Sequence, residues 1–122
     1  MRIIADLHIH SKYSRATSTK MDISEITQFA PVKGLNLVGT GDFTHPRWLK
    51  ELQQNLAEVD GTGLYKPLKP LDSSLRFMIA GEVSTIFSFE GKTKKIHHLI
   101  LTPSFESAIQ INDRLSHYGS LT

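Results

Sequence analysis

The sequence contains no cysteine among its 122 residues. A disulfide framework is therefore excluded, and any bound metal ion must be held by histidine and carboxylate side chains. No apolar run approaches the ~18–20 residues of a membrane-spanning helix, and the first residues lack the apolar region of a signal peptide. The formal net charge of +2 is too small to indicate nucleic-acid binding by itself. From these absences we expect a cytoplasmic protein with no membrane partner.

Polar and apolar residues alternate near the amino terminus, in Asp6-Leu7-His8-Ile9-His10. Alternation with a period of two predicts a strand, and strand side chains two positions apart share a face. We therefore expect Asp6, His8 and His10 to project together near the end of a buried first strand. Two imidazoles and a carboxylate suit a divalent metal ion such as zinc. A solvated strand end is the alternative.

Two more carboxylates follow predicted strands. A helix is predicted over residues 22–30 and leads into a short apolar strand at 35–39, after which comes Asp42. The apolar run 77–80 precedes Glu82 in the same way. The order strand, helix, strand predicts an α/β fold with a parallel sheet, and such folds build their sites at the carboxyl ends of the strands. We expect both carboxylates to lie in the site, although a turn or solvent-facing role is the alternative.

The middle of the chain has helical spacing over 46–60, and its apolar stripe with Trp48 predicts core packing. Pro46 fits the first helical position, and His45 just before it is a further metal-ligand candidate. Residues 61–70 contain two glycines and two prolines and are expected to form an exposed loop.

Residues 87–101 predict a β-hairpin with a charged turn. Its three lysines (Lys92, Lys94 and Lys95) could contact a nucleic-acid backbone or simply be solvated. On the returning strand, His97 and His98 must point to opposite faces, so only one of them can join the site. The polar loop after His10 carries Lys12 and Arg15, which could contact substrate phosphates or face solvent.

Three motifs together resemble the PHP (polymerase and histidinol phosphatase) superfamily: Asp6-Leu7-His8-Ile9-His10-Ser11, Thr40-Gly41-Asp42, and Gly81-Glu82 with a downstream histidine. The resemblance implies the first part of a distorted (β/α)7 barrel, with a mostly parallel sheet, flanking helices and one hairpin. It also implies phosphoester hydrolysis with divalent metal ions. Zinc is the expected ion, and manganese and iron are the alternatives. The late Asp-x-His motif of the superfamily is missing, so residues 1–122 are expected to form a single incomplete domain.

The resemblance also implies roles for individual residues. The ligands would be His8, His10, Glu82 and His98, with Glu82 bridging two ions, and the catalytic residues would be Asp42 and Glu82. Asp42 would be a ligand or would orient a histidine. Phe43 stands where the superfamily has its next ligand histidine, so that ligand is lost unless His45 takes its place. Asp6 would hold the strand end, and His97 would be structural or on the outer face.

Within the superfamily, the chain is most similar to the amino-terminal part of the endonuclease Q family. The similarity includes residues 37–42 followed by Pro46-x-Trp48, and residues 96–100 before a proline. It implies nicking of DNA on the 5′ side of deaminated bases such as uracil and hypoxanthine. Another PHP phosphoesterase, or a non-catalytic domain that binds DNA or a protein, are the alternatives. An exposed sheet edge would also favour self-association.

Overall fold

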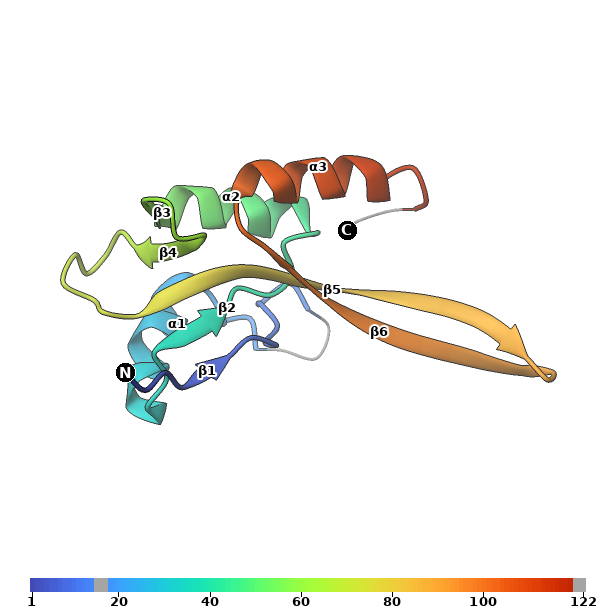
Figure 1. Cartoon of the computed structure of the whole chain (residues 1–122), viewed down its shortest axis with the longest axis horizontal. Coiled ribbons are helices and arrows are strands. Elements are labelled where there is room, and N and C mark those ends of the chain that lie inside the picture. Colours follow the sequence, from blue (N-terminus) through green and yellow to red (C-terminus); the bar gives the residue numbers. More distant parts are fainter. Residues whose placement is uncertain (15–17, 120–122) are drawn as a thin grey trace.

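The computed structural model describes residues 1–14 and 18–119. Within these ranges, three α-helices accompany one mixed sheet of six strands in the order β1-β2-β5-β4-β3, with β6 paired to β5 (Figure 1). None of the described helices is long and apolar enough to cross a membrane. The elements are β1 (Ala5–Asp6), α1 (Ile23–Phe29), the 3-10 helix η1 (Pro31–Lys33), β2 (Leu37–Gly39), α2 (Pro46–Asn55), β3 (Leu56–Val59), β4 (Leu64–Pro67), β5 (Arg76–Phe89), β6 (Lys92–Thr102) and α3 (Phe105–Leu115).

The parallel part of the sheet consists of β1, β2 and β5. Helix α1 connects the first two strands, and its N-cap is Asp22, which accepts a hydrogen bond from the Glu25 backbone N–H. Side chains from α1, including Ile26, pack in the core with Val38 and Phe77. The α/β fold class is therefore confirmed, and the carboxyl ends of these strands lie together.

Strand β1 is shorter and more exposed than the sequence predicts. It pairs with β2 through only two residues, at the edge of the sheet. Ile3 and Ile4, the apolar residues that lead into this strand, are 59% and 41% exposed. The prediction of a buried first strand is wrong because, within the described residues, β1 has a neighbouring strand on one side only. Self-association through this edge stays a prediction.

A second hairpin occupies the middle of the chain. Helix α2 ends at Asn55, not at Asp60, and β3 pairs antiparallel with β4 in place of the expected loop. Leu56 is buried in the core, as a continued helix would also require, so apolar spacing did not distinguish the two structures. Pairing with β4 satisfies the backbone polar groups of these residues.

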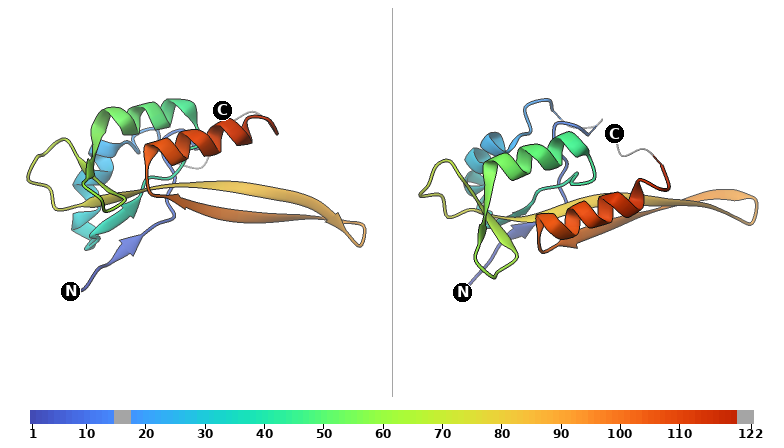
Figure 2. Two further views of the ribbon diagram at one scale, coloured as in Figure 1. Left: turned by 45° about the horizontal axis from the view of Figure 1, so that its top comes forward. Right: turned by 90° about the horizontal axis from the view of Figure 1, so that it is seen from above.

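The long hairpin β5–β6 is confirmed. Its turn residues Glu90 and Gly91 both have positive φ, 51° and 73°, as a two-residue turn of type I′ requires. The hairpin base lies under α2 and α3, and its outer half projects away from the rest of the molecule (Figures 1 and 2). Large apolar side chains on the projecting part, such as Ile86 and Phe89, are exposed.

Candidate metal centre

Three of the predicted ligands meet where β5 leaves the parallel sheet. His8, His10 and Glu82 each offer one ligand atom, and these atoms lie within 4.8 Å of one another. Oε2 of Glu82 is 2.5 Å from Nε2 of His8 and 3.4 Å from Nε2 of His10. The side chain of Glu82 is 18% exposed and that of His8 is 48% exposed, so the group is open to solvent on the histidine side.

The second oxygen of Glu82 faces a histidine from β6. The strand register pairs Ser84 with His97 and Val83 with His98, so the two histidines point to opposite faces, as predicted. Nδ1 of His97 is in contact with Oε1 of Glu82, whereas Nε2 of His98 is 2.9 Å from the Thr85 hydroxyl on the other face. The structure therefore brings His97 to the site and does not bring His98, the expected ligand.

Asp42 contacts both His10 and Ser11 through its carboxylate. Its Oδ2 accepts hydrogen bonds from the backbone N–H and the hydroxyl of Ser11, at 2.7 and 2.6 Å, and its Oδ1 is 3.3 Å from Nδ1 of His10. A proton on Nδ1 of His10 leaves Nε2, the ring nitrogen that faces Glu82, free to bind a metal ion. Of the two roles left open for Asp42, this geometry fits the orienting one.

Ser11 contacts the candidate site through Asp42, and the sequence reasoning missed it. It is completely buried, although a serine after a polar motif at a strand end reads as a loop residue. Its only sequence signal was its place directly after His10. The partner that explains it, Asp42, lies far along the chain.

Two glycines allow the ligand segment to pass close to the end of β2. A Cβ atom on Gly39 would lie 2.4 Å from the Leu7 carbonyl oxygen, and one on Gly41 would lie 2.2 Å from the Ile9 carbonyl oxygen. The indole N–H of Trp48 donates to the Gly41 carbonyl at 2.9 Å. The side chain of Trp48 is buried in the core, which confirms its predicted packing role. The close approach of these backbones places His8 and His10 beside Glu82.

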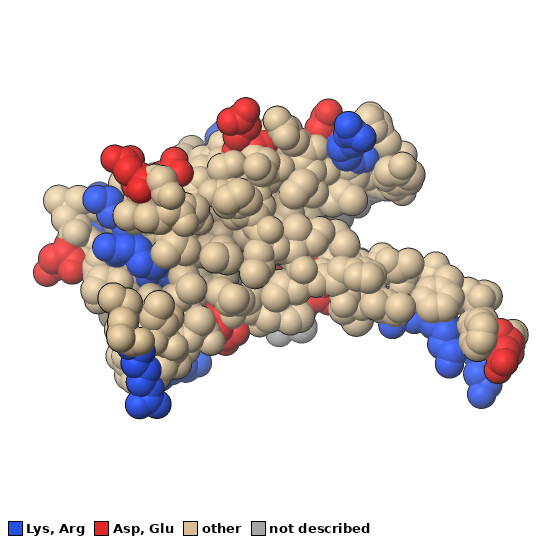
Figure 3. Space-filling model, in the orientation of Figure 1, with Lys and Arg blue, Asp and Glu red and all other residues tan. Residues whose placement is uncertain are grey.

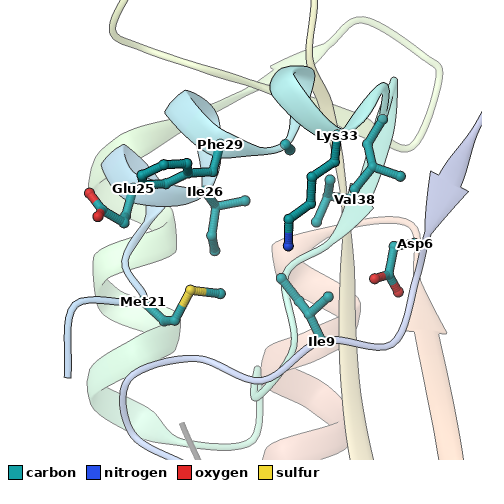
Figure 4. Close-up of a pocket in the computed structure, with 10 residues that line it drawn as sticks. Asp6, Ile9, Met21, Glu25, Ile26, Phe29, Lys33 and Val38 are labelled. Atoms are coloured by element: carbon teal, nitrogen blue, oxygen red, sulfur yellow. The ribbon is translucent and has the colours of Figure 1, made fainter. Parts of the chain in front are cut away.

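Asp6 stands apart from the ligand group. Among the described residues it is not one of the clustered ligands, because β1 ends at Asp6 and strand alternation does not continue to His10. Its Oδ1 accepts a hydrogen bond of 3.2 Å from the His8 backbone N–H, which fits the expected role of holding the strand end. It also borders a pocket of about 350 Å³, with Ile9 and Val38 (Figure 4).

The other candidates do not reach the ligand group. His45 caps α2, where its Nδ1 accepts from the Arg47 backbone N–H. Nζ of Lys12 is 2.9 Å from a carboxylate oxygen of Glu51 on α2, and this contact raises the pKa of Lys12. Lys12 is thus already paired with a carboxylate in place of the expected phosphate. Arg15, the second predicted phosphate contact, lies outside the described residues.

The chemistry of the donor set fits a divalent metal ion. A hydrogen bond from His8 is the largest cause that lowers the pKa of Glu82; burial opposes it, and His97 adds to the lowering. Glu82 is therefore ionised at neutral pH, and imidazole nitrogens face both of its oxygens. A metal ion would compete with the protons held between these groups. The chain is thus a mixed α/β domain with a candidate metal site, whose histidine and carboxylate side chains suit zinc, manganese or iron.

Comparison with known proteins relates this chain to one kind of enzyme. No protein-family model matches the chain. It is similar to the lesion-specific endonuclease PfuEndoQ of Pyrococcus furiosus, with 32% identity, a TM-score of 0.74 and coverage of 93% of this chain. It is also similar to an endonuclease Q solved with a 27-mer duplex that carries an abasic lesion at the active site, with 32% identity, a TM-score of 0.76 and coverage of 95% of this chain.

An uncharacterised protein of Methanocaldococcus jannaschii is 34% identical over 114 residues, or 93% of this chain. The chain spans 12% of that protein and 25% and 26% of the two endonuclease Q chains. The resemblance to endonuclease Q expected from the sequence is thereby confirmed for nearly all of this chain. It extends over about a quarter of the enzymes themselves.

Proposed function

We propose that this chain is the metal-binding part of an endonuclease Q-like DNA repair enzyme that cuts a phosphodiester bond beside a damaged base. The observation that carries the proposal is the position of Glu82, with His8 and His10 at one carboxylate oxygen and His97 at the other. A carboxylate placed in this way suits a bridge between two metal ions. Both solved neighbours are endonucleases, which supports the assignment of the reaction.

The residues of the candidate metal centre have distinct proposed roles. Nε2 of His8, Nε2 of His10 and Oε2 of Glu82 would hold one divalent ion, and Nδ1 of His97 with Oε1 of Glu82 would contribute to a second. Asp42 would keep the His10 ring in place through its contact with Nδ1. When bound, a divalent ion lowers the pKa of water to about 7 and so supplies a nucleophile at neutral pH. We propose zinc as the ion, with manganese and iron as the alternatives.

The proposed substrate is duplex DNA that contains deaminated bases such as uracil and hypoxanthine, cut on the 5′ side. One solved neighbour is bound to a duplex with an abasic lesion, which supports a damaged duplex as the substrate class. The open histidine side of the site, where His8 is 48% exposed, leaves room for a phosphodiester to approach.

Metal content tests the ligand set. We would measure zinc, manganese and iron in the purified chain by plasma mass spectrometry, together with circular dichroism to check folding. The double variant His8→Ala, His10→Ala should lose the metal, and His97→Ala should lower its amount. His98→Ala is the matched control, since it removes the neighbouring imidazole from the opposite face. Unchanged metal in the folded double variant would refute the ligand set.

A nicking assay tests the reaction. Labelled duplexes with a single uracil, hypoxanthine or abasic site would be compared with an undamaged duplex, using this chain and any longer protein that carries it. Cleavage on the 5′ side of the lesion that Glu82→Gln abolishes would support the proposal. Hydrolysis of a phosphomonoester without any nicking would instead indicate another phosphoesterase.

A further inference from the structure

The two faces of the β5–β6 hairpin differ in chemistry. Directly paired strand residues share a face, and the register therefore assigns every pair. The face that carries Glu82, here called the site face, continues outward through polar and mixed pairs. The opposite face carries the two phenylalanines of the projecting part, Phe87 and Phe89. Pairs on the site face are Ser84 with His97, Ile86 with Lys95, and Ser88 with Thr93, and pairs on the opposite face include Phe87 with Lys94 and Phe89 with Lys92.

Lys95 is the one lysine of the hairpin that lies on the site face. It is two positions from His97 on β6 and on the same face, which corresponds to about 6.6–6.8 Å along the strand. Its paired residue Ile86 is four positions from Glu82, or about 13 Å. A two-stranded ribbon twists along its length, so the pairs nearest to Glu82 keep its orientation best. Lys95 therefore extends the same surface on which the ligands lie.

The charge on this surface fits a polyanion. Lys95 is exposed, and among the described residues no ion pair engages it or its two neighbouring lysines. Beyond Glu82, the pairs on the site face contain no carboxylate. The space-filling view shows basic side chains on the outer part of the projecting hairpin and acidic atoms at its tip (Figure 3). An ammonium group flanked by Ser and Thr hydroxyls is a recurring set of donors to phosphate oxygens.

From these observations we infer that the site face of the β5–β6 hairpin holds the sugar-phosphate backbone of the DNA strand that enters the metal centre, with Lys95 contacting a phosphate. This inference rests on the proposed function and adds the surface along which the strand runs. It assigns no DNA contact to the phenylalanine face, although that face carries two of the three lysines. Phosphate contacts position a strand without reading its sequence, so the contribution of Lys95 is the same for damaged and undamaged duplexes.

The test compares Lys95→Ala with Lys94→Ala in the full chain. The two residues are adjacent, both exposed and equally charged, and they differ in the face that they occupy. Binding of a fluorescein-labelled duplex with one abasic site, and of the same duplex undamaged, is followed by anisotropy between about 50 and 200 mM salt, the range over which phosphate contacts are strongly screened. Metal content is measured on each protein in parallel.

For Lys95→Ala we expect about three- to ten-fold weaker binding of both duplexes, with the slope of log K against log salt reduced by about 0.9. Lys94→Ala and Lys95→Arg should bind like the unchanged chain, and metal content should be the same in all. If Lys94→Ala weakens binding as much as or more than Lys95→Ala, the inference is overturned while the proposed function stands. If the unchanged chain holds metal but binds neither duplex, both the inference and the proposed DNA substrate fall.

Discussion

Replacing Gly41 by alanine should separate backbone strain from the close approach that builds the site. Gly41 has φ of +68°, and an added Cβ would lie 2.2 Å from the Ile9 carbonyl oxygen. The left-handed conformation costs a residue with a Cβ about 1–2 kcal/mol, and a forced backbone shift in a packed region costs about 1–3 kcal/mol more. We therefore expect Gly41→Ala to lower the free energy of unfolding by about 2–5 kcal/mol.

Two other glycines provide matched controls for each contribution. Gly91 has nearly the same φ, +73°, but nothing within 4 Å of its added Cβ, so Gly91→Ala should cost about 1–2 kcal/mol. Gly39 does not have positive φ, but its added Cβ would lie 2.4 Å from the Leu7 carbonyl oxygen, so Gly39→Ala should cost about 1–3 kcal/mol. The measurement is urea denaturation, monitored by circular dichroism. The slope of the free energy of unfolding against urea concentration is compared across the three variants.

Metal content gives a second readout of the same variants. Gly41→Ala and Gly39→Ala displace the segment that carries His8 and His10, so both variants should retain less metal in the absence of urea. Gly91→Ala lies in the hairpin turn and should keep its metal. Equal losses of stability in Gly41→Ala and Gly91→Ala, with metal retained in both, would refute the reasoning that the close approach to the ligand segment positions the histidines.

Three further predictions concern the supporting residues. Asp42→Asn removes the charge beside Nδ1 of His10, and retention of metal against a chelator should weaken by about 10–100-fold; retention equal to that of the unchanged chain would contradict the orienting role. Trp48→Phe leaves the Gly41 carbonyl without its indole donor and should cost about 1–3 kcal/mol of stability in urea. Burial raises the pKa of Tyr65, so the neutral phenol stabilises the fold below its ordinary pKa of about 10, and this contribution is lost as the pH rises through the raised value. Thermal unfolding at alkaline pH should therefore depend less on pH in Tyr65→Phe.

Local sequence signals were sufficient for several features. The capping of α1 by Asp22, the turn at Gly91 and the burial of Trp48 depend on residues within a few positions of one another. The order strand, helix, strand likewise indicated that Glu82 and the two histidines near the amino terminus would meet at strand ends, and these groups do lie together. Periodicity and composition carry such information because helices, turns and strand faces repeat over short distances.

Apolar spacing was not sufficient where two structures bury the same residue. Leu56 is buried in the core whether it continues α2 or begins β3, and only its pairing with Pro67 decides for the strand. The exposure of β1 was equally beyond the sequence, because an apolar run does not state how many strands will flank it.

The identity of the histidine at the site depended on tertiary structure. By itself, the sequence determined that His97 and His98 face opposite sides, since strand side chains alternate. Which of them meets Glu82 depends on the register between β5 and β6, and a shift of one residue exchanges the two faces. The contact of Ser11 with Asp42 is of the same kind. Such contacts join segments distant along the chain, and only the folded backbone brings those segments together.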